Sequence, residues 1–215
     1  MSLQSRYELG LEKNSANFVA LTPIDFLARA ALVHPDRTAI VCGERRQSYS
    51  QTYARCRALA DALTQKGVGV GDTVSIIAPN TLEMLEAHFG VPMAGAVLNA
   101  INTRLDSKTV AYIFKHADTK VLIVDRQFHP VVKKALEDLG KKISVIDIID
   151  KQADLKDGKK IGDFEYESFL NGGDNNYVWK RPKDEWQAIS LNYTSGTTGN
   201  PKGVVYHHRG AYLMA

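Results

Sequence analysis

Between residues 73 and 148 the chain alternates β-like and helical segments in a regular order, and this alternation constrains the fold more than any other feature. Apolar and β-branched runs predict strands at residues 73–78, 96–100, 120–124 and 142–148. Stretches with apolar residues at helical spacing predict helices between them, at residues 82–89, 108–116 and 130–139. Strands that alternate with helices pair in parallel. The sequence therefore predicts an α/β fold, with a mostly parallel β-sheet flanked by helices.

A helix, a hairpin and a second helix are predicted before this alternation. Thr22 followed by Pro23 is a typical helix start, and the helical spacing of apolar residues continues until Pro35. Residues 38–42 and 45–49 are expected to pair as a hairpin. Ser50 is then predicted to cap a helix that is closed by Gly67, because serine is a preferred capping residue and glycine often follows a helix end.

After residue 148 the regular alternation of strands and helices stops. Residues 150–163 are rich in lysine and aspartate and are expected to form a surface excursion. Asp163 is predicted to cap a short helix that runs through Phe169, and residues 171–176 are predicted to form a loop. Two β-like runs, at 188–193 and 203–206, then enclose a segment rich in glycine and threonine.

The last residues, 210–215, read as the apolar start of a helix with no turn residue after it. An exposed apolar helix face has nothing to pack against, so we expect the chain to be a truncated part of a longer protein and to self-associate through this surface. We divide it into an N-terminal extension at 1–21 and an α/β subdomain at 22–187. Residues 188–215 would hold the phosphate-binding loop, its flanking strands and the start of a next subdomain.

Charge and cysteine content exclude some classes of function. The net charge of +3 comes from 27 basic and 24 acidic residues that are scattered along the chain, so nucleic acid is not the favoured partner. The two cysteines, Cys42 and Cys56, show neither disulfide nor metal-ligand spacing, so no metal site is predicted. No apolar stretch reaches the roughly 20 residues of a membrane span, and the start lacks a signal-peptide pattern. We expect a cytoplasmic protein.

The segment at residues 193–204 carries the strongest functional signal. Backbone near glycine can approach an anion closely, hydroxyl groups and bare N–H groups donate hydrogen bonds, and a lysine adds positive charge. These properties predict a phosphate-binding loop. The residues expected to contact a nucleotide are Thr194, Ser195, Gly196, Thr197, Thr198, Gly199, Lys202 and Gly203.

Two better-known glycine patterns do not fit. The loop of kinases and GTPases needs four residues between its first glycine and a Gly-Lys-Ser/Thr end that opens a helix, whereas here Lys202 is followed by Gly203 and a β-like run. Glycines 67, 69 and 71 lack the spacing of a dinucleotide fingerprint and lie between a helix and a strand, so they are expected to form a turn.

Residues 193–204 resemble without a break the phosphate-binding signature of the adenylate-forming (AMP-binding) superfamily. Further stretches look like the N-terminal portion of that superfamily, at residues 38–40, 48–53, 71–80, 95–105 and 121–125. Within it, residues 102–106, 124–128 and 206–213 look most like medium-chain and aryl acyl-CoA synthetases, which include plant acyl-activating enzymes. The resemblance covers the chain from about residue 22 onward.

The resemblance implies the N-terminal part of an ATP-dependent acid–thiol ligase. Such an enzyme activates a fatty or aryl carboxylic acid as acyl-AMP and transfers it to coenzyme A, with ATP and magnesium. Lys202 would stabilise negative charge on the leaving pyrophosphate. The fragment itself would be inactive. Two alternatives stay open: an adenylation domain that loads a carrier protein, and a non-catalytic nucleotide-binding module.

Other residue types that often carry chemistry are given structural roles. His207 and His208 are adjacent, so on a strand they would face opposite sides and could not share a metal ion. Trp179 and Trp186 are expected to anchor a loop to the body of the protein. The acidic pair at 184 and 185 is expected to be a solvated turn. For Tyr193, a core position and a nucleotide contact remain equally open.

Overall fold

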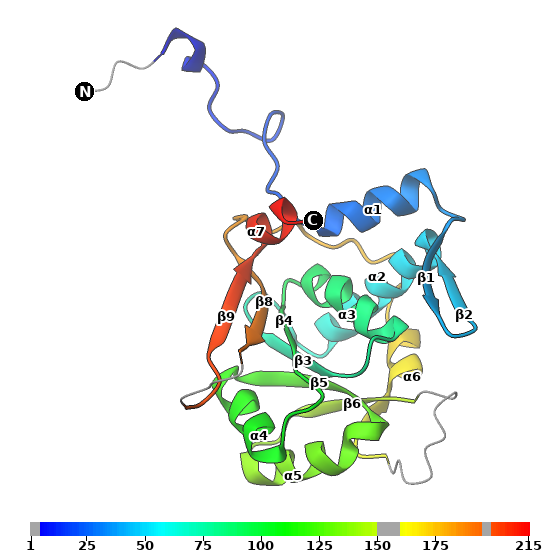
Figure 1. Cartoon of the computed structure of the whole chain (residues 1–215). Coiled ribbons are helices and arrows are strands. Elements are labelled where there is room, and N and C mark those ends of the chain that lie inside the picture. The colour runs from blue at the N-terminus through cyan, green and yellow to red at the C-terminus, as the bar shows by residue number, and fades with distance from the viewer. Residues whose placement is uncertain (1–4, 150–159, 195–198) are drawn as a thin grey trace.

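The computed structural model describes residues 5–149, 160–194 and 199–215, and within them one seven-stranded sheet lies at the centre of the molecule (Figure 1). The strand order is β7-β6-β5-β3-β4-β8-β9. All neighbours pair in parallel except β8 and β9, which are antiparallel. The strands are β3 (Thr73–Ile77), β4 (Val97–Ala100), β5 (Thr119–Asp125), β6 (Ser144–Ile148), β7 (Phe164–Glu165), β8 (Ala188–Tyr193) and β9 (Gly203–His207). The predicted α/β fold with a mostly parallel sheet is confirmed.

Helices cover both faces of the sheet, as Figure 1 shows. Helices α2, α3 and α6 pack on one face, and α4 and α5 on the other. A separate hairpin of β1 (Thr38–Cys42) and β2 (Arg45–Ser48) lies beside α2 and α3. The helices are α1 (Ile24–Val33), α2 (Tyr49–Gln65), α3 (Leu82–Met93), α4 (Ser107–His116), α5 (His129–Leu139), α6 (Tyr166–Asn171) and α7 (His208–Leu213), with single turns η1 (Arg6–Glu8) and η2 (Arg126–Phe128).

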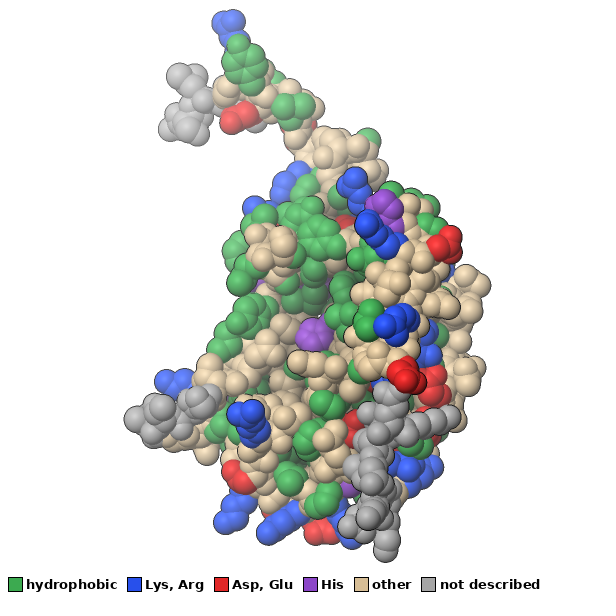
Figure 2. All heavy atoms as spheres, turned by 45° about the vertical axis from the view of Figure 1, so that its right-hand side comes forward, with side chains coloured by type: hydrophobic (Ala, Val, Ile, Leu, Met, Phe, Trp, Pro, Cys, Tyr) green, Lys and Arg blue, Asp and Glu red, His purple; other side chains and the backbone are tan. Residues whose placement is uncertain are grey.

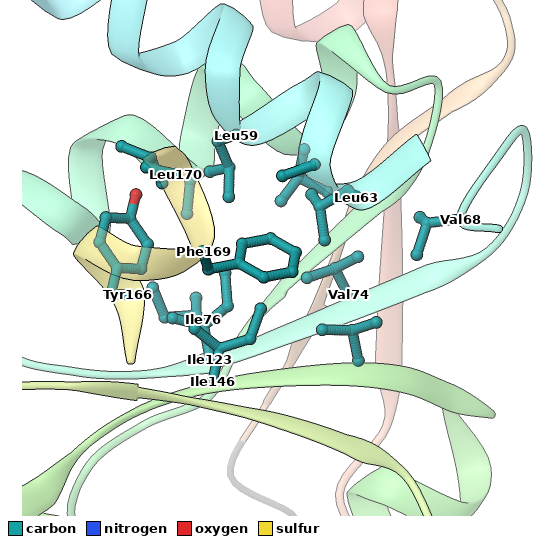
Figure 3. Packing of buried hydrophobic residues seen from close by; sticks show 14 of the residues in the cluster. Leu59, Leu63, Val68, Val74, Ile76, Ile123, Ile146, Tyr166, Phe169 and Leu170 are labelled. Atoms are coloured by element: carbon teal, nitrogen blue, oxygen red, sulfur yellow. The ribbon is translucent and has the colours of Figure 1, made fainter. Parts of the chain in front are cut away.

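The larger apolar core lies between the sheet and the face formed by α2, α3 and α6. Alternate residues of the central strands point into it, and Figure 3 shows Val74, Ile76 and Ile123 below Leu59 and Phe169. Burying a large apolar side chain contributes about 1.5–3 kcal/mol. Because strand side chains alternate between faces, Ile77 and Leu122 point instead into the second core, under α4 and α5.

The chain leaves the neighbouring strands β3 and β4 toward opposite faces of the sheet. After β3 it enters α3, which belongs to the first core, and after β4 it enters α4, which belongs to the second. When the connections of adjacent parallel strands diverge in this way, a crevice opens at the carboxyl ends of the strands. The topology therefore places a cavity at the edge of the sheet where β3, β4 and β8 end.

Three predicted helix starts are wrong. Helix α1 begins at Ile24 with Pro23 at the capping position, so Thr22 is not its cap and Pro23 is not its first residue. Ser48, and not Ser50, caps α2: its hydroxyl accepts a hydrogen bond from the backbone N–H of Gln51, whose side chain accepts one from the N–H of Ser48. Ser50 already lies inside the helix. Asp163 does not cap α6 either, because Glu165 accepts from the N–H groups of residues 167 and 168. The residues before this helix form β7, a two-residue strand that was not predicted. Most of the predicted surface excursion, residues 150–159, lies outside the described residues.

Candidate functional site

The glycine and threonine loop joins β8 to β9 at the carboxyl end of β8, and backbone contacts close its base. Tyr193 pairs with Gly203 at the last position of the two strands. One residue farther along, the N–H of Thr194 donates a hydrogen bond to the carbonyl oxygen of Lys202 at 3.0 Å. Thr194 and Lys202 therefore face each other across the base of the loop.

The predicted phosphate contacts divide into those that the structure describes and those that it does not. Thr194, Gly199, Lys202 and Gly203 are described, and all four are exposed to solvent. Their exposure leaves them accessible to a ligand, and their phosphate-binding role stays a prediction. The other predicted contacts lie outside the described residues: Ser195, Gly196, Thr197 and Thr198.

Two described glycines of the loop differ in their surroundings. A Cβ added to Gly203 would lie 2.9 Å from Leu191 Cδ1, at the end of a flexible side chain, and 3.5 Å from Tyr193 Cζ, an ordinary contact distance. A Cβ added to Gly199 would meet nothing within 4 Å. A side chain at position 203 would therefore need only a small shift of Leu191, and the close backbone approach of a ligand remains the proposed reason for both glycines.

Tyr193 lies both against the second core and at the wall of the cavity. Its ring packs against the second core, and it also lines the cavity at the carboxyl ends of the strands. Its hydroxyl forms a hydrogen bond with Nδ1 of His116, at the end of α4, at 2.6 Å. Burial, followed by the nearby hydroxyl of Tyr112, raises the pKa of Tyr193, so its hydroxyl stays protonated at neutral pH.

The cavity has a volume of about 370 Å³ and lies next to the base of the loop. Among the described residues, no Asp, Glu, Lys or Arg lines it. Of the lining residues, only those in the loop region were predicted from the sequence. The others come from the segments after β3 and β4 and from α3, and the rule that ligands bind at the carboxyl ends of parallel strands would have indicated them. The polar lining residues are Asn80, His88, Asn102, Thr103, Tyr193 and Thr194.

The histidines after the loop have structural roles, as predicted, although the argument from a shared strand was wrong. His207 ends β9, and its Nδ1 accepts a hydrogen bond from the N–H of Gly210 at 2.9 Å, so it caps α7. His208 begins α7 and is buried, with Nδ1 2.9 Å from the hydroxyl oxygen of Thr22. Burial, and then the proximity of His207, lowers the pKa of His208 to about 4.

The two tryptophans differ. Trp179 anchors its segment as predicted, because its Nε1 donates a hydrogen bond to the hydroxyl of Tyr53 at 2.9 Å. Trp186 does not enter the core: it is 66% exposed, and its ring packs against His207 with centroids 4.4 Å apart. For this residue the predicted anchoring is wrong.

The two acidic residues before β8 also differ in their surroundings. Asp184 forms a turn in which it accepts a hydrogen bond from the N–H of Trp186. Glu185, predicted to be solvated, is largely covered: its side chain is 12% exposed, it lies 2.5 Å from Arg209 Nη1, and it accepts a hydrogen bond from the N–H of Leu21. These partners are distant in sequence, so the local pattern could not reveal them.

The surface charge is mixed (Figure 2), and the described residues form neither a metal cluster nor a membrane-spanning helix. On the face that Figure 2 shows, Lys and Arg side chains are scattered among acidic, polar and apolar ones and form no stripe. No three of the described His, Cys, Asp and Glu residues are grouped so that they could hold a metal ion. In the described part of the chain, no helix has the length and apolar character to cross a membrane.

Comparison with known proteins gives close relatives. Over 215 residues, the chain is 48% identical to acetate–CoA ligase CCL3 of Humulus lupulus and 49% identical to acetate/butyrate–CoA ligase AAE7, peroxisomal, of Arabidopsis thaliana. Each match covers 95% of this chain and 38% of the relative. The chain therefore spans less than two fifths of the length of these relatives.

Solved structures show the same fold. The anthranilate CoA ligase AuaEII in complex with anthranoyl-AMP matches 92% of this chain and 37% of its own, with a TM-score of 0.80 and 24% identity. The luciferase-like enzyme of the mealworm Zophobas morio matches 92% of this chain and 45% of its own, with a TM-score of 0.76 and 19% identity. The family pattern of the AMP-binding enzymes matches residues 27–215. The chain belongs to the AMP-binding enzyme family.

Proposed function

We propose that this chain is part of an ATP-dependent acid–CoA ligase that forms AMP. One observation carries the proposal: the glycine and threonine loop lies between β8 and β9, with Lys202 at its base, next to a cavity at the carboxyl ends of parallel strands. Membership of the AMP-binding enzyme family and the CoA ligases among the relatives support it.

In the proposed first step, a carboxylate oxygen of the acid attacks the α-phosphorus of ATP. The bond from that phosphorus to the oxygen of the pyrophosphate group breaks, and pyrophosphate leaves with the electron pair. In the second step, the sulfur of coenzyme A attacks the acyl carbonyl carbon, AMP leaves, and the thiol proton passes to solvent. Charge builds up on pyrophosphate in the first step, so cations and N–H or O–H donors around it lower the barrier.

The residues of this chain would act mainly in the first step. Lys202 would place its ammonium group beside the leaving pyrophosphate and is the proposed catalytic residue. The hydroxyl of Thr194, together with Ser195, Thr197 and Thr198, would donate hydrogen bonds to phosphate oxygens. Backbone N–H groups near Gly196, Gly199 and Gly203 would converge on the same oxygens.

Magnesium would enter with ATP as part of the substrate. The described residues form no cluster of metal ligands, and Mg²⁺ at nucleotide sites is commonly held by substrate phosphates and one or two carboxylates. We therefore assign no residue of this chain to the ion. Its chemistry would be to neutralise phosphate charge.

For the acid, we propose a short aliphatic or an aryl carboxylate. The relatives are named for acetate, butyrate, cinnamate, benzoate and 2-methylpropanoate. The cavity beside the loop is small, and no Asp, Glu, Lys or Arg is among the described residues that line it, which suits a small group better than a long chain. Two of the most similar relatives are named for acetate, so acetate is the first acid to test.

The test is ATP–pyrophosphate exchange by the full-length gene product with each of these acids, followed by measurement of the CoA thioester. Exchange followed by thioester formation would support the proposal. Exchange with transfer to a carrier protein, and none to CoA, would support an adenylation domain instead. Nucleotide binding without exchange would support a non-catalytic module. Residues 1–215 alone are expected to bind ATP weakly or not at all and not to complete the reaction. Micromolar ATP affinity of that chain in calorimetry would contradict the expected weak binding.

Three further expectations are proposals with simple tests. The subdomain boundary between residues 187 and 188 predicts enhanced proteolysis near that position. Self-association of the 215-residue chain predicts a sedimentation coefficient that rises with concentration. A cytoplasmic location predicts diffuse fluorescence of the tagged full-length gene product, whereas several relatives are named as peroxisomal.

A further inference from the structure

A hydrogen bond connects the base of the loop to helix α4. Tyr193 and His116 are 77 residues apart in sequence, yet the phenol oxygen lies 2.6 Å from His116 Nδ1. The two rings meet edge to face, with centroids 5.7 Å apart and an angle of 79° between their planes. His116 also stacks on the ring of Tyr112, with centroids 5.4 Å apart. The imidazole is therefore held by a hydrogen bond and by two rings.

Tyr193 transmits this contact to the loop. It is the last residue of β8 and pairs with Gly203, and its ring lies beside Gly203, where an added Cβ would be in van der Waals contact with it at 3.5 Å. The next pair of residues is Thr194 and Lys202, joined by the backbone hydrogen bond across the base of the loop. A shift of the Tyr193 ring would therefore change the position of the backbone that carries Lys202.

We propose that His116 is a positioning residue for the phosphate-binding loop. Through Tyr193, it fixes the base of the loop so that Lys202 is held in place for the attack of the acid on ATP. This inference rests on the proposed function, because it assigns to His116 an effect on the first step of that reaction. The imidazole itself is not given a contact with substrate.

The protonation state of the pair does not have to be known for this role. A phenol can donate to a bare ring nitrogen, and a protonated Nδ1 can donate to the phenol oxygen. Either arrangement holds the two side chains together. A hydrogen bond contributes about 0.5–1.5 kcal/mol, which corresponds to about a 2- to 12-fold change in an equilibrium or rate constant.

The test uses the full-length gene product and four variants: Tyr193→Phe, His116→Ala, the double variant, and His116→Asn. Asparagine places an amide near the position of Nδ1, so it can restore the hydrogen bond to Tyr193. Tyr206→Phe is the control, since it removes a tyrosine hydroxyl from the same hairpin, away from the contact. The measurements are KM for MgATP and kcat in pyrophosphate exchange, thioester formation from preformed acyl-adenylate, and the unfolding midpoint.

We expect Tyr193→Phe and His116→Ala each to lower kcat/KM for MgATP by about 2- to 12-fold, and the double variant to lower it no further than either one. His116→Asn should recover most of the loss, and thioester formation from acyl-adenylate should stay unchanged. Additive losses, no recovery with asparagine, or a lower unfolding midpoint with unchanged kcat/KM would overturn the positioning role. A wild-type protein that exchanges no pyrophosphate would overturn the proposed function, and the role of His116 with it.

Discussion

Arg55 on α2 and Glu86 on α3 form an ion pair between these two helices, with Arg55 Nε 2.5 Å from Glu86 Oε1. The carboxylate of Glu86 is fully buried and also accepts hydrogen bonds from Gln47 Nε2 and from the hydroxyl of Tyr166, both at 2.9 Å. One carboxylate thus connects β2, α2, α3 and α6. Burial, and then the charge of Glu86, raises the pKa of Tyr166 well above its usual value, so this phenol remains a donor.

Glu86→Ala should destabilise this chain by about 3 kcal/mol. Removing one partner of a buried ion pair typically costs about 3–5 kcal/mol, and the low end applies because Arg55 keeps Glu167 as a partner. Urea unfolding followed by tryptophan fluorescence measures the loss. Glu167→Ala is the control, because its side chain is 49% exposed and exposed pairs contribute at most about 1 kcal/mol. Equal losses in the two variants would contradict this account.

Much of the fold was predictable because the signals are local. The period of the apolar residues between positions 73 and 148 predicted the strands and helices that are found, and their alternation predicted parallel pairing. The strand order was not predictable, since it depends on the face to which each connection turns. The start of α2 could have been placed correctly: Ser48 with Gln51 is the pattern of a capping box, whereas Ser50 has no such partner.

The candidate site was predictable only in its contiguous part. Residues 193–204 carry a pattern that can be read along the chain, although four of them lie outside the described residues. The cavity beside them joins Asn80, His88 and Asn102 from three segments that are separated in sequence. The partner of Tyr193 is equally distant, because His116 belongs to α4. Only the packed sheet brings these groups together.

Two neighbouring glycines after α6 should respond differently to alanine. A Cβ at position 173 would lie 2.1 Å from the carbonyl oxygen of Ala58 in α2, and backbone cannot easily move away. Gly173→Ala should therefore destabilise the chain by about 2–3 kcal/mol. Gly172→Ala is the matched control: its Cβ would lie 3.4 Å from the Phe169 oxygen, so we expect a change within about 0.5 kcal/mol. Thermal unfolding of the two variants measures both changes in stability, and equal changes would contradict the expected clash at Gly173.

The folded protein should become less stable as the pH decreases, because His208 is buried in its neutral form. Burial lowers the pKa of this histidine to about 4 in the folded protein, whereas an unfolded histidine has a pKa of about 6.5. Since the unfolded state binds the proton more readily, the contribution of neutral His208 is complete above about pH 6.5 and is lost as the pH falls toward 4. The loss reaches at most about 3.4 kcal/mol.

Urea unfolding of the wild-type chain and of His208→Gln between pH 7 and pH 4 measures this effect. Glutamine has no titrating group, so the difference in unfolding free energy between the two proteins should shrink as the pH falls. Acidic groups such as Glu185 titrate in both proteins, and their effect cancels in the difference. A difference that stays constant over this range would mean that His208 is not held neutral by its surroundings.

Lys202→Ala in the full-length gene product should act on the first half of the reaction. Removing a charge-assisted contact with the leaving pyrophosphate should cost roughly 1.5–3 kcal/mol, about a 12- to 160-fold fall in the rate of pyrophosphate exchange. Thioester formation from preformed acyl-adenylate should be unaffected, because pyrophosphate has already left. Lys133→Ala is the control, since Lys133 lies exposed on α5 and lines none of the cavities beside the loop. Unchanged exchange with impaired thioester formation would assign Lys202 to the second step, and equal effects of the two alanine variants would leave it no special role.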